Sequence, residues 1–272
     1  MKTILVRGPA LSRSGYGEQT RFALRALRKH EERFNILLVN TGWGQTGWIS
    51  DSGEERDWLD YLLAKGHQHT QQNLPIDISL QVTIPNEWER LAPINIGYTA
   101  GIETTKIAPQ WIEKARMMDK IIVVSNHSKN VFNNTTYTGV VQGTEEEVTI
   151  QNTTEIEVVN YPVRSLEVEN LDIELDYDFN FLAVAQMGPR KNIANTVYWF
   201  IDEFHNEEVG LVLKANTANC TTQDFLRTKA SLKAITDKYP DRKCKIYLVH
   251  GDLSLEQMNS LYTHEKIKSF VT

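Results

Sequence analysis

The sequence of 272 residues has little of several features that mark particular protein classes. It contains only two cysteines, Cys220 and Cys244, which are too few for a disulfide framework or a zinc site. No apolar run approaches the roughly 20 residues that span a bilayer, and the apolar segment after Met1 is too short for a signal peptide. We therefore expect a protein of the reducing cytoplasm, with no transmembrane segment and no bound metal.

Positive charge is also scarce. The formal net charge is −6, and acidic residues cluster between Glu167 and Asp178. Nothing resembles the basic stripe that binds nucleic acid, so we expect no nucleic-acid partner. A ligand with phosphate groups is still compatible with this charge, because a helix N-terminus and one lysine can bind phosphate locally.

Strand and helix patterns alternate along most of the chain, which predicts an α/β fold with parallel sheets and right-handed crossovers. The chain stops on a predicted strand with no helix after it, so we expect the natural protein to continue past Thr272. The ranges are 4–7, 34–39, 77–83, 94–99, 120–124, 179–185, 210–215, 245–250 and 269–272 for strands, and about 17 onward, 54–64, 109–118, 192–204, 222–239 and the segment after Ser254, which opens a capping box, for helices.

Two segments break the alternation. Residues 138–159 are rich in threonine and valine and contain two glycines, which predicts a β-hairpin insertion that serves either an interface or the surface alone. The acidic residues 166–178 are predicted to be a linker. The organisation we expect is an N-terminal domain over 1–165, the linker, and a C-terminal domain over 179–272.

Two loops are candidates for binding phosphate, because ligands of α/β sheets bind where strands end and helices begin. The first contains Gly15, Tyr16 and Gly17, and its spacing fits neither the dinucleotide nor the P-loop pattern. The second contains Arg190, Lys191 and Asn192. A lysine beside a helix N-terminus is unfavourable unless an anion lies between them. For each loop, an ordinary turn without a ligand is the alternative.

Two further loops could face a hydroxylated ligand. The strand that contains Tyr98 leads into a polar loop with one carboxylate, Glu103, which either contacts an acceptor or is a simple loop charge. Trp43 and Trp48 lie in a glycine-rich loop. Their rings either stack on a sugar or cover the edge of the core, where tryptophan is usually buried.

Taken together, these segments resemble the retaining GT-B glycosyltransferases of the group 1 (family four) class. The resemblance covers most of the chain as a sum of moderate motifs. It rests on the segment 96–111 with Gly97, Tyr98, Glu103, Pro109 and Trp111, on 119–132, on 181–185 followed by Arg190, Lys191 and Asn192, on 211–214 and on 253–262.

The resemblance implies two Rossmann-like domains, the second incomplete, and transfer of a sugar from a nucleoside-diphosphate sugar to a carbohydrate or other hydroxyl acceptor with retention of configuration. No cofactor is implied. The implied site residues are Lys191 with Arg190 and Asn192 at the donor diphosphate, Gly15, Tyr16 and Gly17 approaching from the other domain, and Glu103 with Tyr98 and Trp43 at the acceptor.

The sequence departs from the family pattern in two places. Gln186 stands near the position of a family arginine, and the glutamate-containing donor motif expected after residues 269–272 is absent. A chain that ends there is expected to turn over little. Two alternatives therefore stay open: a non-catalytic, degenerate carbohydrate- or nucleotide-binding module of the same fold, and a GT-B-like epimerase. The nucleotide, the sugar, the acceptor and the oligomeric state are not fixed by the sequence.

Overall fold

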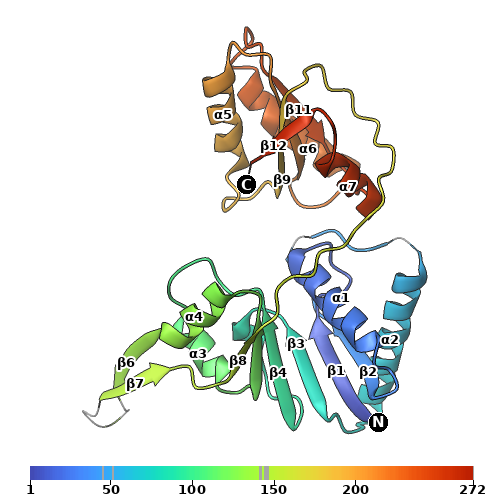
Figure 1. The fold of residues 1–272 in the computed structure, drawn as a ribbon, viewed down its shortest axis with the longest axis vertical. Helices are drawn as coiled ribbons and strands as arrows, with labels where there is room; N and C mark the ends of the chain where they lie inside the picture. Colours follow the sequence, from blue (N-terminus) through green and yellow to red (C-terminus); the bar gives the residue numbers. More distant parts are fainter. Residues whose placement is uncertain (45, 51, 141–142, 144–146, 272) are drawn as a thin grey trace. The chain divides into compact units, whose positions relative to one another are not determined.

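The computed structural model describes residues 1–44, 46–50, 52–140, 143 and 147–271 (Figure 1). The chain divides into two compact units, Met1–Val163 and Arg164–Thr272. Each unit is a parallel sheet covered by helices, so the predicted α/β fold class is confirmed. Among the described residues, no helix combines the length and the apolar character needed to cross a membrane.

Unit 1 is built on a six-stranded sheet with the order β2-β1-β3-β4-β5-β8, in which every neighbouring pair is parallel. The strands are β1 Lys2–Gly8, β2 Phe34–Asn40, β3 Ile78–Val82, β4 Ile94–Thr99, β5 Lys120–Val123 and β8 Ile156–Val158. The helices are α1 Gly15–Arg28, α2 Glu54–Gln71, α3 Pro109–Ala115 and α4 Asn126–Asn134, with a 3-10 turn, η1, at Pro85–Glu87.

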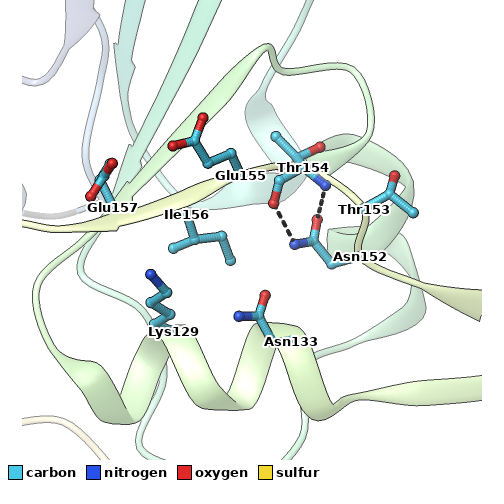
Figure 2. Close-up of a pocket in the computed structure, with 8 residues that line it drawn as sticks. All are labelled: Lys129, Asn133, Asn152, Thr153, Thr154, Glu155, Ile156 and Glu157. Atoms are coloured by element: carbon cyan, nitrogen blue, oxygen red, sulfur yellow. Dashed lines mark hydrogen bonds between the residues drawn. The ribbon is translucent and has the colours of Figure 1, made fainter.

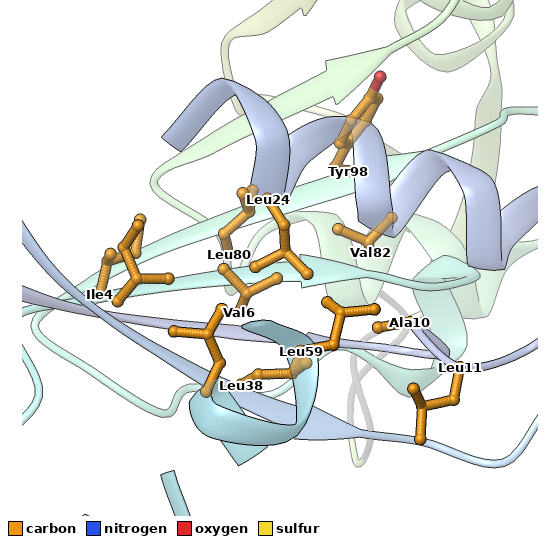
Figure 3. Close-up of a cluster of buried hydrophobic side chains, with 12 residues drawn as sticks. Ile4, Val6, Ala10, Leu11, Leu24, Leu38, Leu59, Leu80, Val82 and Tyr98 are labelled. Atoms are coloured by element: carbon orange, nitrogen blue, oxygen red, sulfur yellow. The ribbon is translucent and has the colours of Figure 1, made fainter. Parts of the chain in front are cut away.

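The main core of unit 1 lies between the sheet and the helices α1 and α2. Figure 3 shows Ile4 and Val6 of β1 packed with Leu24 of α1 and Leu59 of α2. Leu5, between the two β1 residues, is buried as well. Both faces of β1 are therefore covered, which explains its continuous apolar run.

The predicted hairpin is present, but its bounds differ. The antiparallel pair is β6 Thr136–Val140 with β7 Glu147–Gln151, and residues 141, 142 and 144–146 of the prediction lie outside the described residues. Ile156–Val158, expected within the insertion, is strand β8 of the main sheet instead. The reason is packing, because Ile156 is 3% exposed and belongs to the buried cluster around Trp88 and Phe132.

Unit 2 has a four-stranded parallel sheet with the order β11-β10-β9-β12. Alternate residues of β10 face opposite sides, since Leu211 and Leu213 pack beneath α5 and α6 whereas Val212 packs with Leu261 of α7. The elements are β9 Asn180–Gln186, α5 Ile193–Phe204, β10 Gly210–Asn216, α6 Thr222–Thr236, β11 Lys245–Val249, α7 Leu255–Tyr262 and β12 Ile267–Phe270.

Residues 166–178, predicted to be a linker between the domains, pack onto unit 2. Leu171, Ile173 and Leu175 lie against the α7 side of its core. The backbone N–H of Glu169 donates to Ser260 Oγ at 2.9 Å. Acidic residues alternate with these apolar ones. The acidic composition suggested a linker, whereas the period of two is typical of an extended segment with one side buried.

Candidate functional site

The loop between β1 and α1 is held from inside unit 1 by a buried arginine. Arg21 on α1 is 6% exposed, and its Nη1 donates to the backbone oxygens of Ala10 at 2.6 Å and Ser12 at 2.9 Å. Its Nε donates to Glu18 Oε2 at 2.9 Å, which pairs the buried charge. The helix that follows the loop therefore also fixes the loop.

Gly15 and Gly17 differ in their surroundings, although both lie in the first turn of α1 after its N-cap, Ser14. A Cβ on Gly17 would lie 2.0 Å from Ser12 O, whereas a Cβ on Gly15 would have no neighbour within 4 Å. We expect Gly17→Ala to lower the free energy of unfolding by about 2–3 kcal/mol through overpacking. Gly15→Ala should change it by less than about 0.5 kcal/mol. Urea unfolding of both variants checks this, and equal losses would contradict it.

Tyr16 joins this loop to the carboxyl end of β4. Its hydroxyl lies 2.8 Å from Thr99 Oγ1 and accepts a hydrogen bond from the Ala100 N–H at 3.2 Å. Its ring packs against Trp43, with 4.4 Å between the ring centroids and 37° between the planes. The loops after β1, β2 and β4 therefore meet at one edge of the sheet.

Glu103 is exposed in the loop after β4. Burial is the main cause that raises the pKa of Tyr16, and the negative charges of Glu87 and Glu103 raise that pKa further. The charge of Glu103 is therefore the smallest of the five influences on the pKa of Tyr16.

Two more phenols meet a buried glutamine beside this edge. Tyr98 of β4 is 6% exposed, and Tyr161 lies in the segment after β8. The Tyr161 hydroxyl donates to Gln19 Oε1 of α1 at 3.4 Å. Burial, together with the nearby Tyr16 and Tyr98, raises the pKa of Tyr161 to about 12. Gln19 is 1% exposed. Burial raises the pKa of Tyr98, and a hydrogen bond from the Gln19 side chain lowers it by less.

A separate polar pocket of about 390 Å³ lies between α4 and the segment that leads into β8 (Figure 2). Lys129 and Asn133 of α4 point into it from one side. On the other side, the Asn152 amide and the Thr154 backbone hydrogen-bond to each other at 2.8 and 3.2 Å. None of the residues that the sequence predicted for the site lines this pocket.

In unit 2, the predicted phosphate-binding residues form the turn between β9 and α5. Arg190, Lys191 and Asn192 are exposed, and the backbone N–H groups of Lys191 and Asn192 both donate to Gly188 O at 3.1 Å. Asn192 is the N-cap of α5 with φ 51°, and its side chain makes no capping hydrogen bond. The first turn of α5 therefore has no side-chain cap, and an exposed lysine lies beside it. Uncapped helix N-termini can bind anions through their free N–H groups.

A buried pair of side chains lies at the same edge of the unit 2 sheet. His250 follows β11, and its Nε2 lies 3.0 Å from Asp224 Oδ2 of α6, with side chains 5% and 3% exposed. Asp224 also accepts from the backbone N–H groups of Thr217 and Ala218, each at 3.0 Å, which fixes the loop after β10. Burial alone would raise the pKa of Asp224, but these three hydrogen bonds outweigh it and lower the pKa.

The stability of unit 2 should therefore depend on Asp224. Asp224→Asn should cost about 2–3 kcal/mol at pH 7, because a buried N–H donor would face the new amide. Since the folded pKa lies below the unfolded value of about 3.9, the carboxylate stabilises fully above about pH 4, and this contribution is lost as the pH falls through the folded pKa. Urea unfolding at pH 7 and pH 3 should show the cost shrinking in acid, and a constant cost would contradict this.

Asp241→Asn is the matched control for that experiment. Asp241 carries the same charge and also approaches a histidine, His205, at 3.4 Å, but its side chain is 79% exposed. Exposed pairs contribute little to stability, so this variant should unfold as the parent does at both pH values.

The sequence analysis did not single out Gln19, Tyr161, Asp224 or His250. Asp224 looks like an ordinary acidic residue in the first turn of a helix, and Gln19 looks like a surface position of α1. His250 carried one usable signal, because it directly follows an apolar strand, where sheets of this class bind ligands.

Comparisons with known proteins bear on the fold. No protein-family model and no curated protein matches the sequence. A solved structure described as trehalose-6-phosphate from E. coli bound with UDP-2-fluoro glucose is 11% identical, with a TM-score of 0.50, and the match covers 96% of this chain and 76% of that one. The chain has a GT-B-like fold. At this identity the likeness shows the fold alone, with two Rossmann-like α/β units.

Two other solved structures match over a similar share of the chain. An apo structure of OtsA is 13% identical with a TM-score of 0.49, and the match covers 96% of this chain and 76% of that one. The apo form of the lipopolysaccharide outer core galactosyltransferase WaaB is 10% identical with a TM-score of 0.47, over 98% of this chain and 72% of that one.

Proposed function

We propose that this protein is a glycosyltransferase that moves a sugar from a nucleoside-diphosphate sugar to a hydroxyl acceptor with retention of configuration. The observation that carries the proposal is the turn before α5 in a GT-B-like fold. There, the exposed Lys191 stands beside a helix N-terminus without a side-chain cap, at the carboxyl edge of a parallel sheet.

The chemistry requires stabilisation of a leaving group. As the glycosidic bond breaks, the departing diphosphate gains negative charge. Lys191 and the first N–H groups of α5 would hold that charge in place, with Arg190 next to them, and this stabilisation needs no metal. Asn192 adopts a left-handed backbone conformation at the start of α5.

The acceptor side of the proposal lies in unit 1. Trp43 supplies an aromatic ring next to Tyr16, and Glu103 supplies a carboxylate that acts on the same edge. Tyr98 lies in the strand beneath them. The Gly15–Gly17 turn offers open space at Gly15, where a ligand could approach the backbone.

Ligand-observed NMR of this chain with UDP, GDP, ADP and dTDP tests the proposal. We expect one diphosphate to bind in preference to the others. All four share the diphosphate contacts, so the differences in affinity come mainly from the base. The matching diphosphate sugar should then be consumed slowly, and only when an acceptor is present. Consumption without an acceptor would indicate an epimerase, and binding without any consumption would favour a non-catalytic module. Binding of none of the four would overturn the proposal.

A further inference from the structure

The loops after β10 and β11 lie beside the Lys191 turn at the carboxyl edge of the unit 2 sheet, because β11, β10 and β9 are parallel neighbours. We infer that the buried pair Asp224–His250 is a positioning device for the donor, which holds these two loops where they bind the nucleoside part. The inference rests on the proposed function. Three observations carry it: the attachment of both loops to one carboxylate, the distribution of charge between α5 and α6, and the spacing of the strands.

One carboxylate connects both loops. Asp224 accepts from the backbone N–H groups of Thr217 and Ala218, which belong to the loop after β10. Its Oδ2 also lies 3.0 Å from Nε2 of His250, the residue that follows β11. Asp224 itself is fixed in the first turn of α6, where its backbone N–H donates to Thr221 Oγ1 at 3.3 Å. A change in this pair therefore reaches both loops at once.

His250 is held as a donor on a rigid support. Its Nε2 faces a carboxylate, so this ring nitrogen carries the proton. Phe225 of α6 packs against the ring, with 5.5 Å between the ring centroids and 66° between the planes. The next residue, Gly251, has φ 108°, a conformation that favours glycine. Gly251 O accepts from Lys214 Nζ of β10 at 2.7 Å. The loop after β11 is therefore attached to both α6 and β10.

The distribution of charge separates the two ends of the ligand. The first turn of α6 is capped by the Thr221 side chain and carries the Asp224 carboxylate, so the positive end of this helix is already matched. Among the described residues, the first turn of α5 has neither a side-chain cap nor an acidic residue, and Lys191 lies beside it. A diphosphate therefore suits α5, whereas the loops beside α6 suit a neutral ribose and base.

The spacing of the strands fits an elongated ligand. Neighbouring strands lie about 4.8 Å apart, so the ends of β9 and β11 are separated by about 10 Å. A nucleoside diphosphate is long enough to cover this span, with its diphosphate at the turn after β9 and its nucleoside over the loops after β10 and β11. A Cβ on Gly188 or on Gly251 would meet open space, so a ligand can approach the backbone at both ends of the span.

Calorimetric titration of the whole chain with two probes tests this inference. One probe is inorganic pyrophosphate, and the other is whichever of UDP, GDP, ADP and dTDP binds best. His250→Phe keeps an aromatic ring beside Phe225 but removes the donor to Asp224. We expect the Kd of the nucleoside diphosphate to rise by about 10-fold, the scale of losing one hydrogen bond to a charged group. The Kd of pyrophosphate should stay within about twofold of the parent value, because the Lys191 turn is unchanged.

Two further variants separate positioning from direct contact and from general damage. His250→Gln restores an N–H donor at the reach of Nε2 and should bind both probes as the parent does. A loss as large as that in His250→Phe would show that the ring itself contacts the ligand, and would overturn the positioning role. His205→Phe is the matched control and should leave both Kd values unchanged. His205 also approaches a carboxylate, Asp241, at 3.4 Å, but it follows α5 at the amino end of the sheet.

The outcomes separate this inference from the proposed function. Equal losses for the two probes in His250→Phe, or no loss for either, would overturn the inference and leave the transferase proposal standing, because the parent still binds a nucleoside diphosphate. If His250→Phe does not fold, as urea unfolding would show, the smaller His250→Leu takes its place with the same expected losses. If the parent binds none of the four nucleoside diphosphates, both the inference and the proposal fail. If the expected pattern is found but no diphosphate sugar is consumed, the inference stands and the transferase proposal fails.

Discussion

Replacing Lys191 by alanine should lower the rate of sugar transfer by about 100-fold, the scale of losing one preorganised group that stabilises transition-state charge. The loss should appear mainly in kcat, because the diphosphate carries more negative charge as it leaves than it does in the bound donor. Among the described residues the Lys191 side chain makes no hydrogen bond or ion pair, and it is exposed. The variant should therefore fold and unfold as the parent does.

The control for this experiment is Lys243→Ala. Lys243 is also exposed, but it precedes β11 and so lies at the amino end of the unit 2 sheet. Steady-state transfer from the diphosphate sugar whose base binds should be unchanged in this variant. An unchanged rate in Lys191→Ala would remove Lys191 from the mechanism, and equal losses in both variants would point to general surface charge instead. Lys191→Arg should recover part of the rate, since the charge is kept but its position is not.

The order of strands and helices followed from local patterns, which is why most of the fold was predictable. Apolar runs of four to seven residues marked the strands, and caps marked the helix starts. The predicted capping box is confirmed, because Gln257 N–H donates to Ser254 Oγ and Ser254 N–H donates to Gln257 Oε1, each at 3.0 Å. Helix α1 begins at Gly15, two residues before its expected start, because Ser14 rather than Gly17 is the boundary.

Features that depend on distant partners were not predictable in this way. Tyr161 and Gln19 are 142 positions apart, and nothing near either residue announces the other. Strand β8 is only three residues long, so its place in the sheet depends on β5 rather than on its own pattern. The turn with Lys191 could be predicted because both of its parts, the lysine and the helix start, are adjacent in the sequence.

Arg21→Leu should destabilise unit 1 by about 3–5 kcal/mol, the cost of removing one partner from a buried, hydrogen-bonded charge network. Leucine fills part of the space but donates nothing, so the oxygens of Ala10 and Ser12 lose their donors inside the protein. Glu18 would keep its pairing with Arg25, whose Nη1 lies 2.9 Å from Glu18 Oε1. Urea unfolding followed by tryptophan fluorescence should report this loss in the transition of unit 1.

The same helix offers a control and an intermediate variant. Arg28→Leu removes an exposed arginine that pairs with Glu54 at 2.9 Å, with side chains 40% and 85% exposed, and exposed pairs are worth at most about 1 kcal/mol. Arg21→Lys keeps the charge but lacks the planar fork that reaches two carbonyl oxygens and a carboxylate together. It should therefore lose less free energy of unfolding than Arg21→Leu does. A cost for Arg21→Leu no larger than that for Arg28→Leu would show that the loop is held by other contacts.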